Sequence, residues 1–148
     1  MLTEEMQTLI RRYSAGAVAT VNADGTPAVS PKGTFVILDS HTLAFGHIRS
    51  PETVANLRRN PAIEVCFTDV VTRRAVRVTG TATIVRRENA DPALDDAFDA
   101  AWGPYRPHMS AYVRIAVSAA ELILSPAYDL GLTEDELRKT NLERLNTY

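Results

Sequence analysis

The sequence predicts a mainly β domain of the α+β class, in which short antiparallel strands form a barrel with helices at its periphery. Apolar and polar residues alternate with period two over several short runs, and tight-turn residues separate these runs. Gly80 interrupts one of the longer runs, which is typical of the bulges that let a sheet curl. A chain of 148 residues is long enough to bury a core, so we expect one domain over residues 1–148.

The chain begins with a predicted amphipathic helix. Thr3 is a suitable N-cap, and Glu4 and Glu5 suit the positive end of a helix. Apolar residues then recur at helical spacing until Gly16, where we expect the helix to have ended.

Strands are predicted for most of the remaining chain. The turn sequence over residues 22–26 predicts a hairpin between the first two of them. The expected strands are Ala17–Val21, Pro27–Ser30, Thr34–Leu38, Thr42–Phe45, Ala62–Thr68, Ala75–Val85 and Tyr112–Val117.

Three further helices are predicted between and after these strands. One begins with Ser50 as N-cap and Pro51 at the first helical position, and ends at Asn60-Pro61. A second spans Glu88–Ala101 with an acidic outer face. The last begins with the capping-box sequence that starts at Thr133.

Composition excludes several classes of function. The 16 basic and 18 acidic residues nearly cancel, so a nucleic-acid-binding surface is not expected. No apolar run is long enough to cross a membrane, and the acidic first residues do not resemble a secretory signal. The single cysteine, Cys66, is consistent with a reducing, cytoplasmic location.

The familiar catalytic motifs are absent from the sequence. The three histidines (His41, His47 and His108) do not have metal-ligand spacing, and we predict no metal site and name no catalytic acid or base. Asp91, Asp95, Asp96 and Asp99 are interpreted as a solvated helix face rather than paired catalytic carboxylates. Cys66 is interpreted as a small core residue.

One segment does suggest a ligand. A helix N-terminus favours phosphate, and here it carries the Ser50 and Thr53 hydroxyls with Arg49 just before it. Alternation with period two places Ser30 and Lys32 on one face of a strand, where Lys32 would add a second cation. The alternatives are that Ser50 only caps its helix and that Arg49 and Lys32 face water.

These segments resemble a known family. ATVNADGTPAVSPKGT, LAFGHIRSPETVANLRRNPAIEVCF and VRVTGTA, in this order within about residues 15–86, are similar to the FMN-binding split-barrel proteins related to pyridoxamine 5′-phosphate oxidase. SPAYDLG at 125–131 is similar to one small bacterial branch. The resemblance implies a six-stranded antiparallel split β-barrel and a homodimer with one FMN per subunit at the interface.

The resemblance also implies which residues contact FMN. Val29 and Ser30 would line the flavin, and Lys32 would reach its phosphate. Gly46, His47 and Ile48 would lie beside the ring system and the ribityl chain. The remaining implied phosphate contacts are Arg49, Ser50 and Thr53.

Two departures from the family pattern bear on the expected FMN binding and on the expected activity. Glu52 stands where the family often has a basic residue, which would weaken FMN retention or increase the importance of Lys32 and Arg49. The C-terminal substrate-binding segment of true pyridoxamine 5′-phosphate oxidases is missing, so vitamin B6 chemistry is not expected. Trp102 and Tyr105 either wall the substrate side or pack in the core or dimer seam.

We therefore predict an FMN-dependent oxidoreductase that acts on an unidentified small molecule, with NAD(P)H or another electron donor. The alternatives are a flavin-binding electron carrier or sensor, a split barrel that uses deazaflavin or haem, and a cofactor-free dimeric module.

Overall fold

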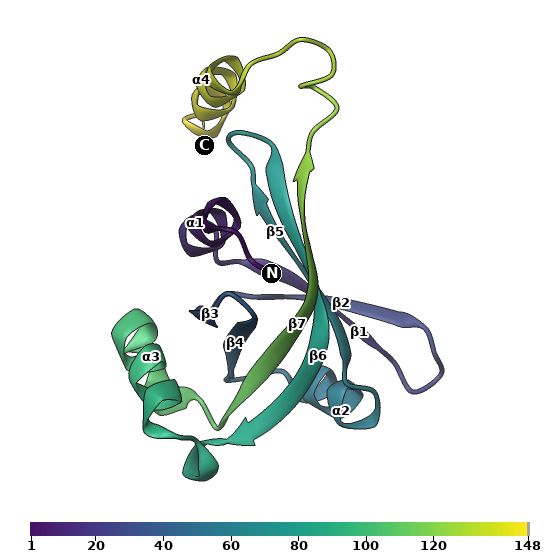
Figure 1. Cartoon of the computed structure of the whole chain (residues 1–148), viewed down its shortest axis with the longest axis vertical. Helices are drawn as coiled ribbons and strands as arrows, with labels where there is room; N and C mark the ends of the chain where they lie inside the picture. The colour runs from purple at the N-terminus through teal and green to yellow at the C-terminus, as the bar shows by residue number, and fades with distance from the viewer. Residues whose placement is uncertain (148) are drawn as a thin grey trace.

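The computed structural model describes residues 1–147 and contains a seven-stranded sheet with four α-helices (Figure 1). Neighbouring strands are all antiparallel, in the order β2-β1-β5-β6-β7-β4-β3. The predicted fold class is confirmed, with seven strands instead of the six that the resemblance implied. In chain order the elements are α1 (Glu4–Arg12), β1 (Gly16–Val21), β2 (Pro27–Lys32), β3 (Phe35–Asp39), β4 (Thr42–His47), α2 (Pro51–Arg59), β5 (Ala62–Asp69), β6 (Arg74–Arg86), α3 (Pro92–Trp102), β7 (Ala111–Leu124) and α4 (Glu134–Leu145).

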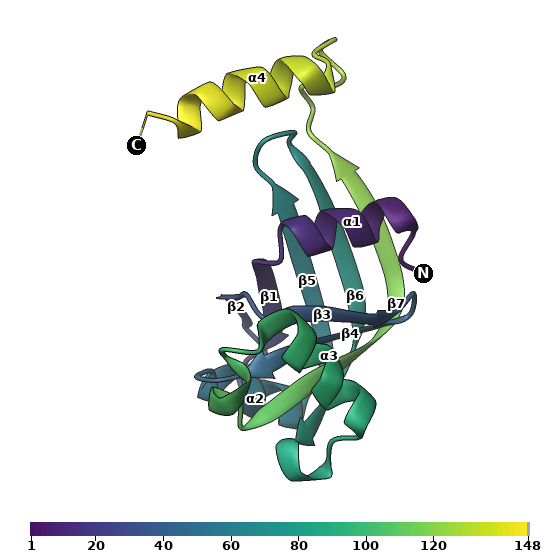
Figure 2. The same ribbon diagram turned by 90° about the vertical axis from the view of Figure 1, so that its left-hand side faces the viewer.

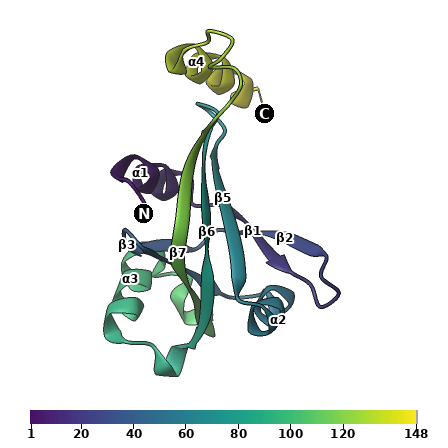
Figure 3. The same ribbon diagram turned by 45° about the vertical axis from the view of Figure 1, so that its right-hand side comes forward.

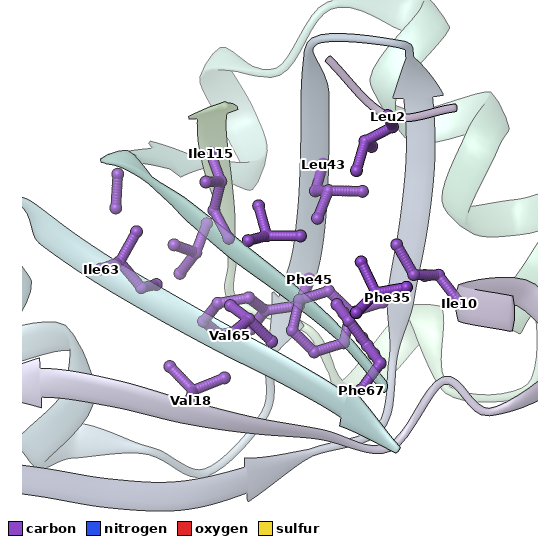
Figure 4. Close-up of a cluster of buried hydrophobic side chains, with 14 of the residues drawn as sticks. Leu2, Ile10, Val18, Phe35, Leu43, Phe45, Ile63, Val65, Phe67 and Ile115 are labelled. Atoms are coloured by element: carbon purple, nitrogen blue, oxygen red, sulfur yellow. The ribbon is translucent and has the colours of Figure 1, made fainter. Parts of the chain in front are cut away.

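The core lies between the long strands β5–β7 and the β3–β4 hairpin, and α1 crosses over β5 and β6 (Figure 2). Side chains from six strands and α1 converge there (Figure 4). Phe35 packs against Phe45 and Phe67 with ring centroids 5.2 and 4.8 Å away. α2 and the β1–β2 hairpin lie on the opposite side of the molecule from α3 (Figure 3).

Gly80 marks the bulge that the sequence predicted. The register between β6 and β7 shifts between Thr79 and Gly80. A Cβ atom at Gly80 would lie only 2.5 Å from the carbonyl oxygen of Ala116, so the close approach of the two strands requires glycine.

Three of the element boundaries that differ from the prediction have a clear physical reason. β2 continues through Pro31 to Lys32, which is possible because an edge strand needs no N–H donor on its open side. β7 extends to Leu124, because its second half pairs with β6. The small residues of that half do not show the apolar–polar alternation from which the strand was predicted. The helix predicted from Glu88 begins at Pro92, where the Asp91 carboxylate accepts a hydrogen bond from the Leu94 N–H.

Two interpretations of individual residues need correction. Cys66 is half-buried on the outer face of β5 with Glu64 and Thr68, so it is not a core residue. The acidic face of α3 is not simply solvated, because Asp95 accepts a hydrogen bond from the Tyr112 hydroxyl at 2.7 Å.

The end of the chain forms α4 beyond the tip of the β5–β6 hairpin (Figure 1). The predicted capping box is present: the Thr133 hydroxyl accepts from the Glu136 N–H, and the Glu136 carboxylate accepts from the Thr133 N–H. Among residues 1–147, no helix combines the length and apolar character that crossing a membrane would require.

Candidate functional site

The end of β2 and the start of α2 meet through their side chains. The Lys32 ammonium donates a hydrogen bond of 2.6 Å to the Ser50 hydroxyl, and the hydroxyls of Ser30 and Thr53 lie 3.3 Å apart. Ser30 and Lys32 share the less exposed face of β2, as alternation predicted. The structure therefore brings together three residues expected to contact a phosphate (Lys32, Ser50 and Thr53) and Ser30, which was expected to line the flavin.

The first turn of α2 keeps hydrogen-bond donors for a ligand. The first N–H groups of a helix have no acceptor within the helix, and Pro51 has no N–H at all. The N–H of Val54 donates to the Ser50 carbonyl, so those of Glu52 and Thr53 precede the first helical hydrogen bond. Ser50 occupies the N-cap position as predicted, but its side chain makes no capping hydrogen bond.

A buried amide fixes the position of α2. The Asn56 side chain donates to the Thr20 hydroxyl and the Asn22 side-chain oxygen, both at 3.0 Å, and accepts from Arg59 at 2.7 Å. This anchor was not among the residues predicted from the sequence. The sequence feature that could have indicated it is a polar residue, Asn56, on the buried face of the helix next to Leu57.

The end of β4 carries two further residues that were expected to contact FMN, Gly46 and His47. A Cβ atom at Gly46 would lie 2.3 Å from the Met109 sulfur, so glycine makes room for this side chain. The Nδ1 atom of His47 is buried and has no hydrogen-bond partner among the described residues. Burial lowers the pKa of His47, and the positive charges of Lys32 and Arg58 lower it further.

The site carries positive charge that no carboxylate neutralises. No acidic side chain in residues 1–147 lies within ion-pair distance of Lys32 or Arg49. Desolvation lowers the pKa of Lys32, so a bound anion would relieve an electrostatic cost. Glu52 is exposed and lines a separate depression with Asn56 and Arg59.

Three predicted contact residues are not gathered at this cluster. Val29 is 68% exposed and points to the face of β2 opposite Ser30 and Lys32. Ile48 and Arg49 are exposed in the turn before α2.

His47 also lines a pocket of about 430 Å³. It is also lined by Arg58 from α2, Arg86 from β6, Glu88 and Ser110, together with apolar residues of α2. Glu88 lies 4.0 Å from Arg86. Apart from His47, these residues were not predicted to form a site, because they come from segments far apart in the chain.

The described residues contain no cluster of three or more histidine, cysteine or acidic side chains that could hold a metal ion. Trp102 lies elsewhere, where its indole N–H donates to the Phe35 carbonyl at 2.9 Å. The ring centroids of Trp102 and Tyr105 lie 6.2 Å apart, and Tyr105 is 52% exposed.

Comparison with known proteins identifies the same fold. The sequence model of the family described as pyridoxamine 5′-phosphate oxidase matches residues 2–125. The structure of HupZ from Group A Streptococcus is similar, with 29% identity, a TM-score of 0.69, and coverage of 84% of this chain and 96% of that one. A comparison with curated proteins found no match.

Two further solved structures are also similar. An F420 reductase has 25% identity and a TM-score of 0.61, over 78% of this chain and 94% of that one. An FMN-binding protein from Syntrophomonas wolfei has 12% identity and a TM-score of 0.68, over 84% and 87%. The latter similarity concerns the fold alone.

Proposed function

The chain belongs to the pyridoxamine 5′-phosphate oxidase family, and we propose that it binds FMN and acts as a flavin-dependent oxidoreductase on a small molecule. The observation that carries this proposal is the contact between Lys32 on β2 and Ser50 at the start of α2. It joins a cation to a helix N-terminus, which is a suitable arrangement for a phosphate dianion.

The residues at this junction fit the phosphate of FMN. Lys32 would balance part of its charge, while the hydroxyls of Ser30, Ser50 and Thr53 and the first N–H groups of α2 would donate hydrogen bonds. Arg49, exposed in the turn just before α2, would supply the second cation. The lowered pKa of Lys32 supports this role, because a dianion would replace the hydration that burial removes. The uncompensated charge of the site is therefore matched to an anionic ligand.

The bound flavin would supply hydride or electron transfer, and this chain would supply position and electrostatics. The exposed apolar side chains of Val29 and Ile48 lie beside the phosphate-binding residues in the sequence, outside the monomer's core. We propose that they contact the flavin ring or a partner subunit, in a homodimer with FMN at the interface. NAD(P)H is the proposed class of electron donor.

Flavin titration tests the phosphate site directly. The purified protein, stripped of bound flavin, should take up FMN with saturation of the visible absorbance change, and riboflavin should bind far more weakly because it lacks the phosphate. Equal affinity for FMN and riboflavin would exclude the phosphate site, and absence of FMN uptake would exclude the proposal. Oxidation of NAD(P)H by the FMN-loaded protein then separates an enzyme from an electron carrier.

A deazaflavin is the second candidate cofactor. It is favoured by the similarity to an F420 reductase at 25% identity. Competition between F420 and FMN for the stripped protein discriminates the two, since the tighter ligand displaces the other. The effect of Lys32→Met on each affinity shows whether both use the same anion site.

A further inference from the structure

A second pocket, of about 480 Å³, lies between α1, the edge strand β3 and α3. It shares no lining residue with the proposed flavin site. Its lining residues are Ile10, Arg11, Ser14, Phe35, Val36, Ile37, Ala97, Ala101 and Trp102. Mostly apolar walls with few polar groups are typical of small-molecule sites of this size.

The back wall of this pocket is ordered by a specific hydrogen bond. β3 is at the edge of the sheet, so its outward-facing backbone groups have no partner strand. The indole N–H of Trp102 donates to the outward-facing carbonyl of Phe35 at 2.9 Å. Backbone direction alternates along a strand, so the peptide groups of Ile37 face the same open side and offer an N–H donor.

Small residues on α3 leave the space open. Ala97 and Ala101 are four residues apart, so they lie on the same face of the helix. Both line the pocket. A leucine at either position would project into it.

Arg11 is the one charged side chain among the lining residues. Its guanidinium donates to the neutral Gln7 side chain at 3.2 Å, and no acidic side chain in residues 1–147 lies within 4.0 Å of it. Two acids of α3, Asp95 and Asp99, are instead within ion-pair distance of Arg106. The pocket therefore combines an apolar interior with one unneutralised cation.

We infer that this pocket binds a small amphiphile with an apolar body and a single carboxylate. The body would occupy the space between Ala97, Ala101 and Trp102, and the carboxylate would accept hydrogen bonds from Arg11. This is a binding site in addition to the flavin site, and it does not depend on the proposed function.

The chain's single tryptophan reports on this pocket, because Trp102 is part of its wall. We would titrate octanoate and octan-1-ol, below the concentrations at which they aggregate, and follow tryptophan fluorescence with and without added FMN. Octanoate should give a saturable change that Arg11→Gln weakens about tenfold or more, as expected for a charge-assisted hydrogen bond. The affinity for octan-1-ol should not change in Arg11→Gln.

Matched variants locate the binding site. Ala101→Leu and Ala97→Leu each fill the pocket and should abolish the saturable change, and the use of both keeps the test decisive if one variant is unstable. Arg12→Gln is the control, since Arg12 lines a different pocket. A missing octanoate response, equal effects of Arg11→Gln and Arg12→Gln, or an unchanged response in a folded leucine variant would each overturn the inference. Failure of FMN uptake would leave the octanoate result unchanged.

Discussion

The molecule has two polar clusters at opposite ends, and they differ in whether their charges are neutralised internally. At the tip of the β5–β6 hairpin, Arg74 lies 3.1 Å from Glu5, 3.6 Å from Glu134 and 4.0 Å from Asp69. Near α2, the hydrogen-bond partner of the Lys32 ammonium among the described side chains is the neutral hydroxyl of Ser50. A cluster whose charges are compensated within the chain needs no ligand, whereas one with excess positive charge is suited to an anionic ligand.

The hairpin cluster joins three segments of the chain. Asp69 is 2% exposed and accepts hydrogen bonds from the N–H groups of Val71 and Thr72 and from the Thr72 hydroxyl. The Tyr128 hydroxyl and the buried Asn141 side chain donate to the Thr72 and Val71 carbonyls, which attaches the C-terminal segment. Each of these groups is therefore satisfied within the chain, which leaves the cluster little to offer a ligand.

Removal of Asp69 is expected to have the largest effect. Asp69→Ala leaves buried N–H groups without acceptors, so the free energy of unfolding should fall by about 2–4 kcal/mol in urea titrations. Folded protein should still bind FMN with wild-type affinity, because the two clusters lie at opposite ends. A folded Asp69→Ala variant with weakened FMN affinity would contradict this separation. Thr72→Val, which removes only the hydroxyl, is the milder second variant.

Asp69 also predicts acid sensitivity. Burial alone would raise its pKa, but the hydrogen bonds from Thr72, Tyr13 and Val71 lower it below the usual value. A carboxyl with a lowered pKa in the folded state stabilises the fold above its unfolded pKa, and this stability is lost as the pH falls through the folded pKa. The stability difference between wild type and Asp69→Ala should therefore shrink in acid.

Replacement of Lys32 tests the other side of the comparison. Lys32→Met keeps the apolar stem and removes the charge, so FMN affinity should fall by about one to two orders of magnitude. Stability without FMN should be unchanged or slightly higher, because burial of the ammonium is a cost. Lys139→Met, at the chain's other lysine, exposed on α4, is the matched control. Equal effects of the two substitutions on FMN affinity would refute the phosphate site.

The parts of this molecule that follow from local sequence were predictable. Alternation identified the face of β2 that carries Ser30 and Lys32, and the capping box identified the start of α4. The bulge at Gly80 was predictable, because a glycine inside an alternating strand often marks a bulge or a close approach of another backbone.

The parts that depend on distant segments were not predictable in this way. The anchor from Asn56 to Thr20 joins residues 36 positions apart, and neither residue type alone indicates a partner. The interpretation of Cys66 as a core residue failed because its strand has a buried face and an outer one, and Cys66 shares the outer face with polar neighbours. All the predicted FMN contacts stay predictions, and those of Val29, Ile48 and Arg49 have in addition no support from the single chain, which leaves these side chains exposed.

Substitution of Glu52 would increase the excess positive charge near the start of α2. It lies in the first turn of α2, where a carboxylate stabilises the helix but repels a phosphate. Glu52→Gln should tighten FMN binding by about two- to fivefold and lower stability by about 0.3–1 kcal/mol. Glu143→Gln, on the exposed surface of α4, should change neither quantity. An unchanged FMN affinity in Glu52→Gln would mean that the carboxylate points away from the bound phosphate.

The smallest expected effect concerns His47 and its pH dependence. A histidine with a lowered folded-state pKa resists protonation in the folded chain, so the fold loses stability as the pH falls from the unfolded pKa, about 6.5, toward the folded value. His47→Asn should remove this loss, while the same change at exposed His108 should not. Bound FMN should also reduce it, because a nearby dianion favours the charged imidazole. Unfolding curves between pH 7.5 and 5 measure these differences, and an identical slope in wild type and His47→Asn would show that the imidazole is hydrated and outside the field of Lys32.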